Sequence, residues 1–208
     1  MADLTLIHTA EVHRATFDRI AARIAPGARL AHIVHPDWLA RARTGIGTDL
    51  AAEVTATLRA ISGPVLCSCT TLGPLAADAG AIRIDAPMMA RAARLGGPIL
   101  MAYCLDSTRA PSLALLRQAC AAAGHVPEIR PLDLTTAWPL FEAGPPQTFS
   151  RQIADRIGDQ LAAAPEIACV VLAQASMAGA TGYLKTAVPV LSSPETALQA
   201  ALGLTPPG

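Results

Sequence analysis

A cysteine at the end of a predicted strand is the residue of this sequence best suited to chemistry. Cys69 follows the apolar run 64–68 and precedes two hydroxyl side chains, Thr70 and Thr71. We expect a helix-like segment to open here, and the N–H groups at a helix start favour negative charge, so the position predicts a lowered thiol pKa. A thiolate can remove a proton from carbon, and a thiol can deliver one. We therefore predict an acid–base role for Cys69, in preference to a buried apolar cysteine.

Polar side chains also follow other predicted strands. The candidate substrate-binding residues are His8, Thr9, Thr70, Thr71, Asp106, Ser107, Thr108, Gln174 and Ser176. Hydroxyls and backbone N–H groups can stabilise the negative charge that develops on a substrate carboxylate. Each Ser or Thr, taken singly, could instead cap a helix, and so could Asp106. His8 could instead be a buried core residue with its hydrogen bonds satisfied. Their gathering at strand ends is what favours a site.

Other motifs favour structural roles. We expect Cys67 to be a buried apolar residue. Cys104 follows another predicted strand and is a weaker candidate for the site than Cys69. His32 and His35 lie three residues apart in a predicted strand, which directs them to opposite faces and argues against a zinc site. The sequence contains no glycine-rich phosphate loop and no Gly-x-Ser-x-Gly elbow. We therefore predict no metal.

Short apolar runs alternate with longer amphipathic stretches, which is typical of βα units and a mainly parallel sheet. The chain also repeats: the segment around Cys69 aligns with the segment around Gln174, 105 residues later. Residues 84–87 align in the same way with residues 191–194, 107 residues later. Two registers that agree this closely indicate a duplicated domain.

The predicted fold class is α/β, with two similar lobes that each hold a mainly parallel sheet flanked by helices. The first lobe is expected to span residues 1–95, with residues 188–208 packing back on it, and the second to span residues 96–187. A pseudo-two-fold would relate the lobes and place the site in the cleft between them, with Cys69 and Gln174 facing each other. Ligands of open α/β sheets bind at the carboxyl ends of the strands.

The motifs resemble those of a known superfamily. Cys69-Thr70-Thr71-Leu72-Gly73 is similar to the Cys-Asn/Ser-Thr motif of the aspartate/glutamate/hydantoin racemase superfamily. Residues 83–88 and 171–177 resemble segments of its uncharacterised bacterial members. The resemblance implies two α/β lobes, no metal or pyridoxal phosphate, and a small carboxylate substrate. In the racemases of this superfamily, two cysteines flank the substrate's α-carbon.

The sequence departs from that pattern at the second cysteine, where Gln174 stands. An amide does not exchange protons near neutral pH. His8-Thr9 also replaces the Asp-Ser pair of glutamate racemases, so the carboxylate that assists the first cysteine is absent.

Three functions stay open. The leading one is a cofactor-independent isomerase or racemase that acts at the carbon adjacent to a carboxylate, with Cys69 as the acid–base group. The second is a decarboxylase of a malonate-like acid in which Cys69 is the sole proton donor. The third is a non-catalytic binder of small carboxylates. A cysteine hydrolase is weaker, because no Cys–His–Asp arrangement can be placed.

Composition excludes several partners. The formal net charge is zero, which offers no electrostatic footprint for nucleic acid or an anionic membrane. The N-terminus lacks an export signal, and the five cysteines show no secreted disulfide pattern, so we expect a cytoplasmic protein. The oligomeric state is left open, with a homodimer as the commonest arrangement.

Overall fold

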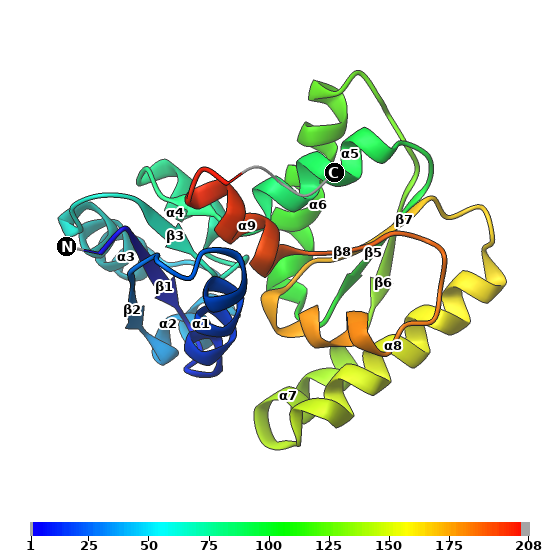
Figure 1. Ribbon diagram of the computed structural model, residues 1–208, viewed down its shortest axis with the longest axis horizontal. Coiled ribbons are helices and arrows are strands. Elements are labelled where there is room, and N and C mark those ends of the chain that lie inside the picture. The colour runs from blue at the N-terminus through cyan, green and yellow to red at the C-terminus, as the bar shows by residue number, and fades with distance from the viewer. Residues whose placement is uncertain (1, 205–208) are drawn as a thin grey trace. The chain divides into compact units, whose positions relative to one another are not determined.

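The computed structural model describes residues 2–204, which divide into two compact units (Figure 1). The first unit comprises Met1–Pro87 and Pro194–Gly208, and the second comprises Met88–Ser193. Each unit is built around one sheet of four parallel strands. The α/β fold with two similar lobes is therefore confirmed.

The first sheet has the strand order β2-β1-β3-β4. Its strands are β1 (Leu4–His8), β2 (Leu30–Val34), β3 (Val65–Cys67) and β4 (Ile82–Arg83). The helices of this unit are α1 (Val12–Ile24), α2 (Pro36–Ala42), α3 (Thr48–Ala60) and α4 (Gly73–Asp78), together with α9 (Ser193–Ala201), whose first residue belongs to the second unit. Every residue of β1 is buried, as expected for a central parallel strand.

Side-chain alternation gives the first sheet two distinct faces. Ile7 of β1 and Cys67 of β3 join a core cluster formed mainly by α2, α3 and α4. Helix α3 reaches this cluster through Leu50, Val54 and Leu58, whose spacing of four residues places them on one side of the helix. His8, the next residue of β1, contacts Phe17 of α1, with ring centroids 5.4 Å apart. Helix α1 therefore packs against β1 on the His8 side.

The second sheet repeats the same order as β6-β5-β7-β8. Its strands are β5 (Ile99–Tyr103), β6 (Ile129–Asp133), β7 (Cys169–Leu172) and β8 (Val190–Ser192). Its helices are α5 (Ala86–Leu95), whose first two residues belong to the first unit, α6 (Asp106–Ala122), α7 (Trp138–Ala143) and α8 (Pro146–Ala163). The unit also holds the 3₁₀ segments η1 (Thr135–Ala137) and η2 (Ala175–Gly182). Strand β3 corresponds to β7 in this order, which agrees with the alignment of Cys69 and Gln174.

Helices α5 and α6 cover one face of the second sheet. Met88 and Met89 of α5 and Leu116 of α6 pack in one cluster with alternate residues of β5 and β7. Helix α8 lies against η2. No helix within residues 2–204 combines the length and the apolar character needed to cross a membrane.

Candidate functional site

Cys69 lies in the loop between β3 and α4, and 7% of its surface is exposed. The expectation that a helix opens at this residue is wrong, because α4 begins four residues later, at Gly73. Pro74 occupies the first turn of that helix, a position where its missing N–H group costs no hydrogen bond. The loop itself is turned by a hydrogen bond from the Gly73 N–H to the Thr70 carbonyl (3.0 Å). Cys69 is therefore presented by a loop at the carboxyl edge of the sheet.

Four hydrogen bonds converge on the Cys69 sulfur. They come from the Thr9 hydroxyl, the Thr71 hydroxyl, and the backbone N–H groups of Thr71 and Leu72. Burial nevertheless raises the pKa of the Cys69 thiol above its ordinary value, and these hydrogen bonds oppose the rise. The predicted lowering of this pKa is thus wrong, because desolvation of the thiolate outweighs the donors around it. Without a bound ligand, Cys69 is a protonated thiol at neutral pH.

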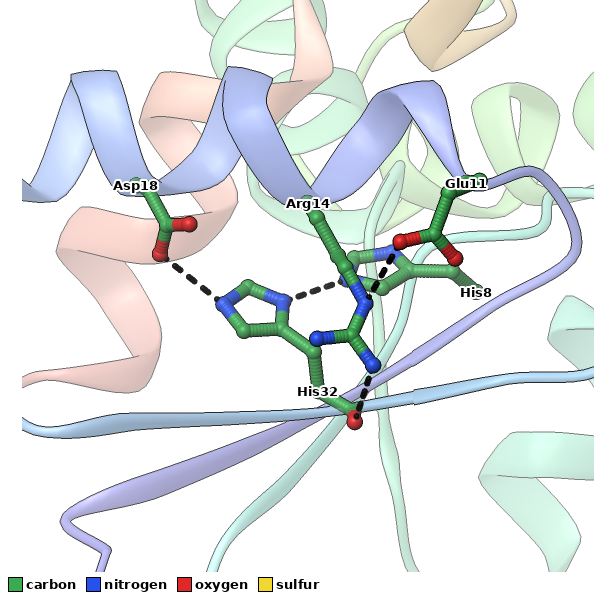
Figure 2. A network of polar contacts seen from close by, with 5 residues as sticks. All are labelled: His8, Glu11, Arg14, Asp18 and His32. Carbon is green, nitrogen blue, oxygen red and sulfur yellow. Dashed lines mark hydrogen bonds and ion pairs between the residues drawn. The ribbon is translucent and has the colours of Figure 1, made fainter.

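His8 has hydrogen-bond partners other than Cys69. Its Nδ1 lies 2.8 Å from the Ser68 hydroxyl oxygen, and its Nε2 lies 2.8 Å from Nδ1 of His32. Nε2 of His32 is 3.0 Å from Oδ1 of Asp18 on α1 (Figure 2). Arg14, which pairs with Glu11, donates to the His32 carbonyl at 3.2 Å. His8 is thus linked to Ser68, His32 and Asp18, and none of these three is among the residues predicted to bind substrate.

Burial sets the protonation of the two histidines near α1. It lowers the pKa of His8 to about 3, with a further contribution from nearby positive charge, and it lowers the pKa of His13 to about 4. Both imidazoles are therefore neutral at pH 7. Because the unfolded chain takes up protons near pH 6.5 and the folded protein does not, folding should weaken as the pH falls from 6.5 towards 3.

We expect the free energy of unfolding to fall on the order of 5 kcal/mol between pH 7 and pH 4.5, about half from each histidine. The stabilising contribution is complete above pH 6.5 and is lost as the pH falls from 6.5 to the lowered pKa values of the two histidines. Urea titrations at several pH values measure it. In His13→Leu, the pH dependence over this range should drop by about half. An identical slope in His13→Leu and the natural protein would contradict the assignment for His13.

A buried ion pair supports the Cys69 loop from β4. Arg83 and Asp85 form two hydrogen bonds of 3.0 and 2.8 Å, and Asp85 is fully buried. The Arg83 guanidinium packs so closely on Gly73 that a Cβ added there would lie 2.9 Å from Nε. Glycine at the start of α4 therefore lets the ion pair pack beneath the end of the loop.

In the second unit, Gln174 follows β7 and is buried. Its Oε1 accepts a hydrogen bond of 2.6 Å from the backbone N–H of Cys104, which follows β5. The side chain therefore ties together the ends of two neighbouring strands. Nearby, the buried Tyr103 hydroxyl donates to Asp133, and burial together with this carboxylate raises the pKa of Tyr103.

Replacing Gln174 by Leu should destabilise the protein by about 1–3 kcal/mol, because it leaves the buried Cys104 N–H without an acceptor. Gln174→Glu keeps an acceptor oxygen at the same place and serves as the matched comparison. Denaturant unfolding of both variants at pH 7 measures the difference. Equal stability of Gln174→Leu and the natural protein would show that the hydrogen bond contributes nothing.

The remaining candidates of the second unit lie at the same carboxyl edge of the sheet. Asp106 is the first residue of α6 and is exposed, whereas Thr108 is buried and Ser107 lies between them in the first turn. Ser176 lies in η2, and its buried hydroxyl oxygen has no hydrogen-bond partner within residues 2–204.

Two surface hollows of the second unit lie elsewhere. One is lined by residues that precede β6, among them His125 and Pro127. The other is lined by residues that precede β7 and β8, among them Pro165 and Val188. Both therefore lie at the amino ends of the strands, opposite the edge that carries the candidate residues.

No protein-family model matches the sequence, and no curated protein matches it. Solved structures do match over nearly the whole chain. A glutamate racemase isoform from Bacillus anthracis is 14% identical, with a TM-score of 0.70 over 96% of this chain and 80% of that one. An allantoin racemase from Klebsiella pneumoniae is 16% identical, with a TM-score of 0.60 over 98% of this chain and 89% of that one. A variant of arylmalonate decarboxylase is 15% identical, with a TM-score of 0.54 over 96% and 91%.

These similarities extend through both units, and the matched structures include racemases as well as a decarboxylase. At such low sequence identity they establish the architecture alone. The chain has the two-lobed α/β fold that is seen in these racemases and in the decarboxylase.

Proposed function

We propose that the protein is a cofactor-independent enzyme of the racemase type that acts at the carbon next to the carboxylate of a small acid. The observation that carries this proposal is the convergence of four hydrogen-bond donors on the buried Cys69 sulfur. Such donors stabilise the thiolate that forms when the thiol gives its proton to carbon. A cysteine that served only as a buried apolar residue would not need them.

The protonation state of Cys69 sets the first step. Because burial keeps the thiol protonated, Cys69 begins as a proton donor. To act as a base it must lose its proton, which the surrounding Thr9, Thr71 and Leu72 donors make easier. In the proposed reaction, Cys69 transfers a proton to or from the α-carbon, and hydroxyls and N–H groups stabilise the enediolate formed there.

The same observations favour decarboxylation as the second candidate. Gln174 stands where the superfamily's racemases carry their second cysteine, and its oxygen is already engaged by the Cys104 N–H. A decarboxylase needs only one donor: loss of carbon dioxide from a malonate-like acid leaves an enediolate, and Cys69 protonates it. The decarboxylase among the structural neighbours is consistent with this chemistry.

The substrate class can be tested by proton NMR of the protein in deuterium oxide. The panel should contain amino acids, hydantoins, maleate and substituted malonates. Deuterium appearing at an α-carbon without loss of carbon dioxide indicates racemase-type chemistry, and release of carbon dioxide indicates decarboxylation. If no acid reacts while one of them raises the melting temperature, the protein is a carboxylate binder and the proposal is wrong.

A further inference from the structure

A chain of hydrogen bonds crosses the first unit from its surface to the residue before Cys69. It runs through Asp18, His32, His8 and Ser68, with separations of 3.0, 2.8 and 2.8 Å. Figure 2 shows the part from Asp18 to His8. The Asp18 side chain is 61% exposed, the His32 side chain is 7% exposed, and His8 is fully buried. One end therefore meets water, and the other end, Ser68, is buried.

With both imidazoles neutral, the four groups can hydrogen-bond in only one direction along the chain. The Asp18 carboxylate can only accept, so His32 donates from Nε2. With neutral imidazoles, Nδ1 of His32 then accepts from Nε2–H of His8. Nδ1 of His8 in turn accepts from the Ser68 hydroxyl. All donors thus point outward, from Ser68 towards Asp18.

We propose that Asp18, His32 and His8 form a proton relay that makes Ser68 a second proton-transfer group beside Cys69. A serine hydroxyl is a poor acid–base group unless its own proton has an acceptor, and Nδ1 of His8, 2.8 Å from the Ser68 oxygen, supplies that acceptor. Ser68 adjoins Cys69 in the loop after β3, which is where the proposed function places its chemistry. The inference rests on that proposed function for its substrate.

A proton can pass along the relay without leaving a charge on either imidazole. As the Ser68 oxygen takes a proton from the bound acid, the hydroxyl proton moves to Nδ1 of His8. The Nε2 proton of His8 moves to Nδ1 of His32, and the Nε2 proton of His32 moves to the Asp18 carboxylate, which releases it to water. The electron pair of the broken C–H bond stays on the substrate as the enediolate. The reverse sequence delivers a proton.

Other titratable groups surround the relay without forming part of it. The His13 ring lies 6.1 Å from the His8 ring, and Arg14 donates to the backbone carbonyl of His32 at 3.2 Å. Glu11, on the same side of α1, pairs with Arg14 at 2.9 Å and is exposed. Glu11→Gln therefore removes a neighbouring carboxylate and leaves the relay intact, which makes it the matched control for Asp18→Asn.

The relay can be tested without a substrate, by measuring how fast the buried His8 Nε2 proton exchanges with water in ¹⁵N-histidine-labelled protein. Asn at position 18 keeps an acceptor oxygen but cannot take the proton, so Asp18→Asn should slow this exchange at least about tenfold. Glu11→Gln should stay within about twofold of the natural protein. Equal exchange in Asp18→Asn and the natural protein, or equal slowing in both variants, would overturn the relay.

Turnover then tests the role of Ser68. On an acid that the natural protein converts, Ser68→Ala and Asp18→Asn should each lower kcat about tenfold or more, with Glu11→Gln unchanged. Full activity in Ser68→Ala would overturn the proposed role of Ser68. If the natural protein converts no acid while Asp18→Asn still slows the His8 exchange, the proposed function fails and the relay itself stands.

Discussion

Cys69→Ala should abolish turnover, lowering kcat about 100- to 10,000-fold, while the protein stays folded. Removing the sulfur removes the group on which Thr9, Thr71 and Leu72 converge, and alanine cannot transfer a proton. The affinity for the substrate should change little, because the hydroxyls and N–H groups of the loop remain. The measurements are kcat by NMR and ligand affinity by calorimetry.

Cys67→Ala is the matched control for this variant. Cys67 lies two residues earlier, is buried in the same core cluster, and has a pKa raised to about 12 by burial. Its sulfur donates to the backbone carbonyl of Cys69 (3.7 Å), so we expect it to take no part in proton transfer. We expect Cys67→Ala to lose some stability and to keep its activity. An active Cys69→Ala protein, or equal loss of activity in both variants, would contradict the assignment.

The largest loss of stability should come from Asp85→Asn, about 3–5 kcal/mol. Asp85 is fully buried, and the Arg83 side chain is 11% exposed, so the change leaves a buried positive charge without its carboxylate. Because the guanidinium packs on Gly73, we also expect the Cys69 loop to become less ordered. Urea unfolding at pH 7 measures the first effect, and amide hydrogen exchange at residues 70–73 measures the second.

Asp3→Asn provides the comparison. Asp3 pairs with Arg29 at 2.8 Å, but both side chains are largely exposed, and surface ion pairs contribute little to stability. The free energy of unfolding should therefore be nearly unchanged in Asp3→Asn. If Asp85→Asn is as stable as Asp3→Asn, the Arg83–Asp85 pair does not support the loop as described.

Hydrophobic patterning predicted the strands of both sheets well. The apolar run 64–68, predicted as a strand, contains β3, because the inner strands of a parallel sheet are continuously apolar. Helix α2 was missed, although Pro36 at its start and Asp37 in its first turn are typical helix-start residues. At seven residues, α2 is too short for its periodicity to stand out from the flanking loops.

The site could be predicted only in part. Its location at strand ends follows from the fold class, and the structure does bring Thr9 and Thr71 to the Cys69 sulfur. The direction of the Cys69 pKa shift could not be predicted, because it depends on how deeply the loop is buried. The predicted cleft that would bring Cys69 and Gln174 together stays a prediction.

The contact between His8 and His32 needed information that a single sequence does not carry. In the register of β1 with β2, His8 pairs with Val34 and Leu6 pairs with His32. The two histidines therefore point to the same face, two positions apart, and α1 adds Asp18. The sequence predicted opposite faces for His32 and His35, which is consistent with His35 stacking on Trp38. The sequence did not indicate that His8 and His32 would lie on the same face of the sheet.

The most direct test of the central claim is deuterium incorporation at the carbon next to the carboxylate. The natural protein, Cys69→Ala and Cys67→Ala should be compared in deuterium oxide on the same acid. We predict that the natural protein and Cys67→Ala place deuterium on that carbon and that Cys69→Ala does not. Incorporation by Cys69→Ala at the rate of the natural protein would contradict proton transfer by Cys69.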